Sequence, residues 1–124
     1  MRTTLLVALG GALGSVLRYG TSLAMHYLHR AVWPLGTLSV NLAGCLAIGI
    51  VMGLYQDRSA VSEGARMFLA VGVLGGFTTF SAFGYESVEL LRRGAATTAL
   101  LYGAASVLGG LAAAWLGLWL ADHL

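Results

Sequence analysis

The stretch that decides how this chain folds is GVLGGFTTFSAF, residues 72–83. It lies inside an apolar segment, yet three glycines within five residues are followed by the adjacent threonines Thr78 and Thr79. Glycine in a helix interior costs about 1 kcal/mol relative to alanine, and threonine costs somewhat less. The composition therefore predicts a helix that breaks near its middle, between Gly75 and Thr79. Helices that break at membrane depth free backbone groups and usually line a binding site or an ion path.

The rest of the chain is also built from membrane-spanning segments. Of its 124 residues, 58% are hydrophobic and 10% are charged, whereas soluble domains carry about 25% charged residues. A span needs about 20 mostly apolar residues, and four segments meet this requirement: 3–25, 35–55, 67–90 and 95–121, the third being uncharged as far as Tyr85. We therefore expect one all-α domain, residues 1–124, with four transmembrane helices of which the third is broken. The first segment is long enough to span and lacks a small-residue cleavage pattern, so we do not expect a signal peptide.

The arginines are spread almost evenly over the two sides of this four-span arrangement. One side has Arg2, Arg58 and Arg66, and the other has Arg30, Arg92 and Arg93, with Arg18 added if its side chain extends that way. Membrane orientation follows the Lys/Arg bias between loops, and here the bias nearly vanishes. We predict that the chain inserts in both orientations and pairs antiparallel with a second copy of itself. The alternative is one preferred orientation with a weak bias.

Several polar side chains lie within the predicted spans, and five of them could converge in one bundle interior: Asn41, Thr79, Ser81, Tyr102 and Ser106. An unpaired amide in hydrocarbon costs several kcal/mol, so Asn41 should face that interior. Tyr102 and Ser106 are four residues apart and share one helix face. For Asn41, an interhelical hydrogen bond without a role in transport is the competing interpretation.

A break in the third span would place two kinds of ion site next to each other. Carbonyls freed at the break suit a cation, and the N-terminus of the following half-helix suits an anion. Phe80 and Phe83 share a face, and their electropositive ring edges could contact a small anion without a tight charged trap. The alternative is a phenylalanine pair that only packs. Arg18, near the headgroup region, either snorkels or faces an aqueous vestibule where it attracts anions.

Other chemistry finds little support. Cys45 is the single cysteine, and the three histidines fall near span ends without metal-ligand spacing. No nucleophile–base pair is visible, so we expect no enzyme, and nothing indicates a nucleic-acid partner. Residues 56–66 are expected to form a plain hydrophilic turn. Glu89 should pair with Arg93, four residues later, whereas the role of Glu86 is open.

The chain resembles the Fluc/CrcB family of fluoride channels over nearly its whole length. The resemblance rests on three motifs: GGALG at 10–14 with Arg18-Tyr19, GTLSVNLAG at 36–44, and GGFTTFSAF at 75–83 followed by Glu86. The third motif is highly specific, and the first is weak by itself. The family pattern often has threonine where this chain has Ala82 and serine where it has Gly110, which removes two hydroxyls from or near the polar residues.

The resemblance implies a passive channel that exports fluoride across the cell inner (cytoplasmic) membrane and lowers its toxicity, built as an antiparallel homodimer with two pores. It implies that Phe80 and Phe83 present ring edges to the pore and that Asn41 hydrogen-bonds the ion. It also implies that the carbonyls of Gly75 and Thr78 from both subunits bind a structural sodium ion. The other pore residues it implies are Thr79, Ser81, Tyr102 and Ser106, the last three as a polar track.

Two other functions fit a small four-span protein. A multidrug-type proton-coupled exporter would need a carboxylate inside the first span, and residues 3–25 contain none. A membrane scaffold, whose glycines and polar residues only pack, would conduct no ions.

Overall fold

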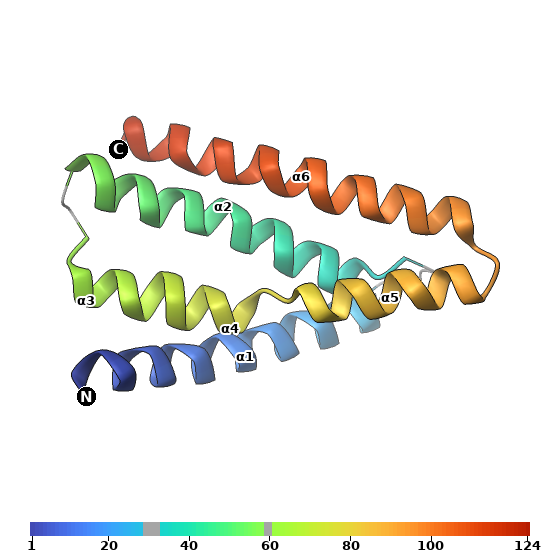
Figure 1. Ribbon diagram of the computed structural model, residues 1–124, viewed down its shortest axis with the longest axis horizontal. Helices are drawn as coiled ribbons and strands as arrows, with labels where there is room; N and C mark the ends of the chain where they lie inside the picture. Colours follow the sequence, from blue (N-terminus) through green and yellow to red (C-terminus); the bar gives the residue numbers. More distant parts are fainter. Residues whose placement is uncertain (29–32, 59–60) are drawn as a thin grey trace.

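The computed structural model describes residues 1–28, 33–58 and 61–124, so the position of Arg30 lies outside the described residues. Within them the chain is almost entirely helical and contains no strand. The helical rods run alternately up and down the bundle (Figure 1). The elements in chain order are α1 (Arg2–Leu28), α2 (Leu35–Arg58), α3 (Glu63–Arg66), the π-helix η1 (Met67–Leu74), α4 (Gly75–Phe77), α5 (Phe80–Arg92) and α6 (Ala96–Asp122).

The rods agree with the four predicted spans, although most of the helices are a few residues longer. Among the described residues, three helical segments are long and apolar enough to cross a membrane: Leu35–Gln56, Glu63–Arg92 and Ala96–Asp122. The 27-residue α1 is also long enough, but Arg18 and several small residues make it less apolar. The chain is therefore an all-helical, multi-pass membrane protein, and the assignment of α1 as a further span stays a prediction.

One expectation about the loops is wrong. Residues 63–66 form the helix α3 instead of belonging to a hydrophilic turn. The reason is local, because the Ser62 side chain accepts a hydrogen bond from the Ala65 N–H at 3.2 Å and so caps the helix. The Arg66 guanidinium then pairs with the Glu63 carboxylate at 2.6 Å. That carboxylate also accepts a hydrogen bond from the Tyr55 hydroxyl at 2.8 Å.

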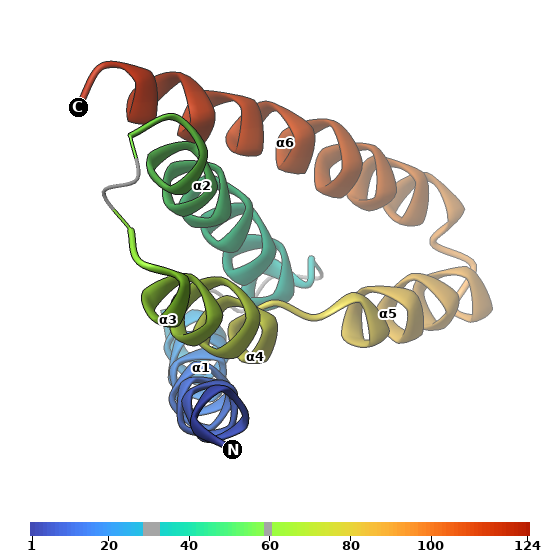
Figure 2. The same ribbon diagram turned by 60° about the vertical axis from the view of Figure 1, so that its left-hand side comes forward.

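Close helix packing depends on glycines. A Cβ atom on Gly14 of α1 would overlap the Val73 carbonyl oxygen, so α1 and η1 meet backbone to backbone. Gly49 of α2 and Gly117 of α6 face each other in the same way. Figure 2 shows the result: α1 lies along η1 and α4, α2 lies beside α6, and α5 diverges from α1 beyond the break.

Candidate ion-binding site at the break in the third helix

The third rod breaks at Thr78 and Thr79, inside the predicted interval. The helix α4 ends at Phe77 and α5 begins at Phe80, and both intervening residues are extended, with ψ of 157° at Thr78 and φ of −151° at Thr79. The break is visible in Figure 1 as the unwound link between α4 and α5. It lies near the middle of the bundle, where backbone groups cannot rely on bulk water for partners.

Asn41 of α2 holds this break with two hydrogen bonds. Its Nδ2 donates to the Thr79 carbonyl at 3.0 Å, and the Thr79 N–H donates to its Oδ1 at 2.8 Å. The two partners also fix the amide orientation, because a carbonyl can only accept and an N–H can only donate. Asn41 therefore faces the bundle interior as predicted. The observed bond is interhelical, and one N–H of the side-chain amide remains for another acceptor.

The carbonyls of residues 75–78 all lose their helical donors at the break, and for two of them, Gly75 and Thr78, a side chain takes the donor. In a continuous α-helix the Thr79 N–H would bond the Gly75 carbonyl, and the Ala82 N–H would bond the Thr78 carbonyl. Here the Thr79 N–H donates to the Asn41 Oδ1, and the Ala82 N–H donates to the Thr79 Oγ1 at 3.2 Å. The described part of the chain offers the two carbonyls no replacement donor.

Those carbonyls belong to residues that line an open groove. Gly75 and Thr78 both lie on a groove of about 380 Å³ next to the break, and a Cβ on Gly75 would meet nothing closer than 4.0 Å. The neighbouring Gly76 instead packs against the backbone of Gly11. Unwound carbonyls at the end of a half-helix are known ligands of Na⁺ in transporters. The residues named for sodium by the family resemblance are thus chemically suited to a hard cation.

The start of α5 presents the opposite polarity. The amides of Phe80 and Ser81 have no acceptor among the described residues, and the first N–H groups of a helix form a natural anion site. The Ser81 hydroxyl lies 3.2 Å from the Thr79 hydroxyl, which adds a second polar group at this helix end. This arrangement has the polarity that suits a small anion.

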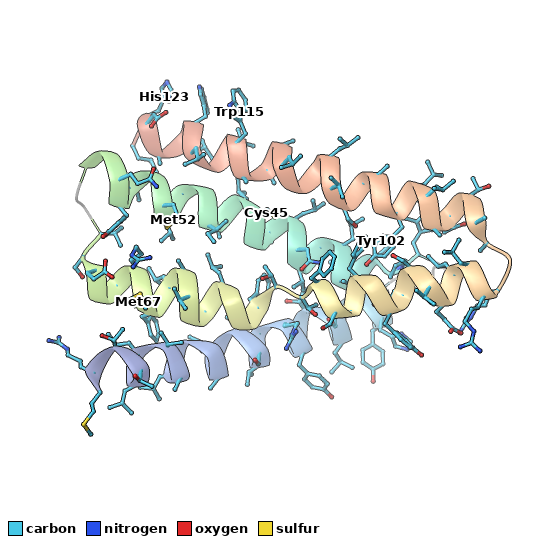
Figure 3. All side chains as sticks on the ribbon, viewed as in Figure 1. Cys45, Met52, Met67, Tyr102, Trp115 and His123 are labelled. Carbon is cyan, nitrogen blue, oxygen red and sulfur yellow. The ribbon has the colours of Figure 1, made fainter. Side chains whose placement is uncertain are left out.

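An aromatic row continues from the break towards α6. The Phe80 and Phe83 ring centroids are 5.6 Å apart with a 43° tilt, and the Phe83 and Tyr102 centroids are 5.2 Å apart. Phe80 is 82% exposed, whereas Tyr102 is fully buried. Figure 3 shows Tyr102 between the helices, while Trp115 and His123, farther along α6, point outward.

Most of the predicted site residues meet around this groove. Its lining includes Gly75 and Thr78 together with Asn41, Thr79, Phe80, Phe83 and Ser106. The Ser106 Oγ is buried and has no hydrogen-bond partner in the described part of the chain. Ser81 adjoins the groove through Thr79, and Tyr102 adjoins it through Phe83. Arg18, which lies on α1, does not line the groove, so its vestibule role stays a prediction.

A further polar cluster at the far side of Phe83 was not predicted. The Glu86 carboxylate accepts the Thr37 hydroxyl through Oε1 and the Tyr102 hydroxyl through Oε2, both at 2.7 Å. The sequence spacing indicated in part that these residues lie near the site. Glu86 is three residues after Phe83 and Thr37 is four residues before Asn41, so each shares a helix face with a predicted site residue. The predicted ion pair between Glu89 and Arg93 is confirmed, with Nε and Oε1 2.9 Å apart.

These features define a class: a multi-pass helical membrane protein with a broken helix, freed backbone dipoles and an aromatic pair along one groove. The sequence model of the family described as "CrcB-like protein, Camphor Resistance (CrcB)" matches residues 5–118. The chain belongs to the CrcB family.

Full-length relatives support the same assignment. A protein named fluoride-specific ion channel FluC from Hyphomonas neptunium is 51% identical, with 100% of this chain and 98% of the relative aligned. Proteins of the same name from Thermus thermophilus and Flavobacterium psychrophilum are 50% and 44% identical, covering 94% and 100% of this chain, and 93% and 100% of those relatives. The relatives are named as channels, which agrees with the expectation that the chain is not an enzyme.

Proposed function

We propose that this chain forms a passive, fluoride-selective channel that exports fluoride across the cytoplasmic membrane and so lowers its toxicity. One observation carries the proposal: the start of α5, Asn41 and the Phe80–Phe83 pair meet at one groove. The full-length relatives that are named for fluoride supply the identity of the ion.

The groove suits an anion that must enter and leave quickly. Its lining contains no charged side chain among the described residues, so attraction comes from N–H dipoles, hydroxyl groups and aromatic ring edges. Such groups bind a small anion more weakly than an arginine would, and conduction requires that compromise. Fluoride would contact the Phe80 and Phe83 edges, the free Asn41 N–H and Ser81, and then the Tyr102 and Ser106 side of the groove.

A second, antiparallel copy would complete the pore. Phe80 is large, apolar and 82% exposed, and the groove beside it is open, so the single chain leaves this side without cover. Covering it with an inverted copy would give two equivalent grooves and hence two pores. The carbonyls of Gly75 and Thr78 from both copies would then hold a sodium ion. Such an ion would supply positive charge that keeps two carbonyl-rich helix ends together.

Ion efflux from liposomes tests this function. Purified protein is reconstituted in vesicles loaded with fluoride or with chloride, and efflux is followed with ion-selective electrodes under valinomycin and K⁺. We expect rapid fluoride efflux and chloride efflux near that of empty vesicles. Phe80→Ile, which keeps an apolar side chain but removes the ring edge, should slow fluoride efflux by at least roughly tenfold, because an edge contact worth about 1.4 kcal/mol is lost.

The competing functions give different results in the same vesicles. A non-conducting scaffold would release neither ion, and a non-selective anion pore would release both at similar rates. Either outcome would contradict the proposal.

A further inference from the structure

The hydrogen bonds at the break connect the anion groove to the Gly75 and Thr78 carbonyls. The Thr79 N–H, whose helical partner would be the Gly75 carbonyl, is 2.8 Å from the Asn41 Oδ1. As long as Asn41 accepts this hydrogen bond, the Gly75 carbonyl has no helical donor.

The Thr79 side chain acts in the same way one turn later. Its Oγ1 accepts the Ala82 N–H at 3.2 Å, which is the usual bond between an N-cap residue and the third residue of a helix. The helical partner of the Ala82 N–H would be the Thr78 carbonyl. The cap that starts α5 therefore also keeps the Thr78 carbonyl free.

We infer that Asn41 and Thr79 are positioning residues for a cation site: by accepting two backbone amides, they keep the Gly75 and Thr78 carbonyls available to a hard monovalent cation such as Na⁺. The inference rests on the proposed function in one respect, namely that these carbonyls hold the cation. It assigns to Asn41 a role beyond contact with the anion. It also makes the cation site depend on two side chains that do not touch the cation.

The surroundings of the Gly75 and Thr78 carbonyls support this positioning role of Asn41 and Thr79. Gly76 also lies in the last turn before the break, but its backbone packs against Gly11 of α1. Gly75 and Thr78 line the open groove and are the two residues whose donors are captured by side chains. Gly44 lets Thr78 lie close against α2, since a Cβ at position 44 would overlap the Thr78 Cγ2.

The test measures how Na⁺ stabilises the purified full-length protein. Thermal unfolding in detergent is followed over a series of Na⁺ concentrations at constant ionic strength, with N-methylglucamine as the replacement cation. The variants are Asn41→Leu, which removes the acceptor for the Thr79 N–H, and Thr79→Val, which removes the acceptor for the Ala82 N–H. The controls are Thr79→Ser, which keeps the hydroxyl, and Ser106→Ala, which alters the groove away from the break.

Wild-type protein should gain stability as Na⁺ rises. Asn41→Leu and Thr79→Val should each raise the Na⁺ concentration of half-maximal stabilisation by roughly tenfold, because the freed amides compete for the carbonyls. Thr79→Ser and Ser106→Ala should stay close to the wild-type value, whatever they do to fluoride efflux.

Two results would overturn the inference. If Asn41→Leu and Thr79→Val conduct poorly but respond to Na⁺ like the wild type, the two residues act on the anion path alone. If the wild type does not respond to Na⁺, the carbonyls hold no such cation, and fluoride efflux then shows whether the channel function stands without it. Should Asn41→Leu fail to fold, the comparison of Thr79→Val with Thr79→Ser decides.

Discussion

Two hydroxyl groups hold the Glu86 carboxylate, one from Thr37 and one from Tyr102, each at 2.7 Å. Both donors are buried, with Thr37 7% exposed and Tyr102 fully covered. No ion pair to Glu86 is found among the described residues, so the hydroxyls supply the stabilisation that a cation would otherwise provide. A hydrogen bond to a charged group contributes about 1.5–3 kcal/mol.

Removing one of these hydroxyls should therefore destabilise the protein. We expect Tyr102→Phe to lower the unfolding free energy by about 1.5–3 kcal/mol, because the carboxylate loses one of its two donors. Thermal unfolding in detergent measures the effect. Tyr85→Phe is the matched control, since Tyr85 is 71% exposed. Equal unfolding midpoints for the two variants would show that the Glu86 bond contributes no stability.

Individual residues differed in how far the sequence could predict them. Asn41 was predictable because a lone amide in an apolar span must find a partner inside the protein, and its partner is Thr79. The Glu86 cluster was not predictable, because its hydroxyls come from α2 and α6 and meet Glu86 only through tertiary packing. The exposure of Phe80 was likewise not visible in the spacing that pairs it with Phe83.

At the level of elements, the third rod determines the site. Its break follows from local composition, since glycines and adjacent threonines weaken a helix wherever they occur. The π-helix over Met67–Leu74 has no such signal. π-Helical turns are mostly single bulges found at functional sites, and here the segment lies against the glycines of α1. Its form depends on packing between two rods, which a local sequence pattern does not encode.

The contact between α1 and η1 can be tested with one methyl group. Gly14→Ala should destabilise the protein by about 1–3 kcal/mol, because the added Cβ overlaps the Val73 carbonyl oxygen. Gly20→Ala on the same helix is the control, since a Cβ there has nothing within 4 Å. That substitution should be neutral or slightly stabilising. If both variants unfold at the same temperature, the close approach of the two backbones is not needed.

At the level of the whole molecule, both termini, the end of α2 and the start of α3 lie at one end of the bundle (Figure 1). Arg2 and Arg66 belong to that end, and Arg92 and Arg93 belong to the other. The near balance of arginines that the sequence predicts therefore persists among these four residues. Four rods and their alternation were predictable from hydropathy. The predicted pairing with a second, antiparallel copy stays a prediction, because it depends on surfaces between chains.

The balance of arginines makes a prediction about insertion. A reporter enzyme fused to the carboxyl terminus should be found on both faces of the membrane in comparable amounts, because the Lys/Arg bias sets orientation. Adding two arginines to the carboxyl terminus should shift the population towards one orientation. A reporter confined to one face in the unmodified protein would rule out the antiparallel pairing of copies.

Passive conduction of fluoride is the central claim, and the current–voltage relation in a planar bilayer tests it most directly. With a fluoride gradient and equal chloride on both sides, we predict that the current reverses at the equilibrium potential of fluoride. Adding a pH gradient should leave that potential unchanged, because no carboxylate among the described residues lines the groove. A reversal potential that follows chloride, or that shifts with the proton gradient, would contradict a passive fluoride channel.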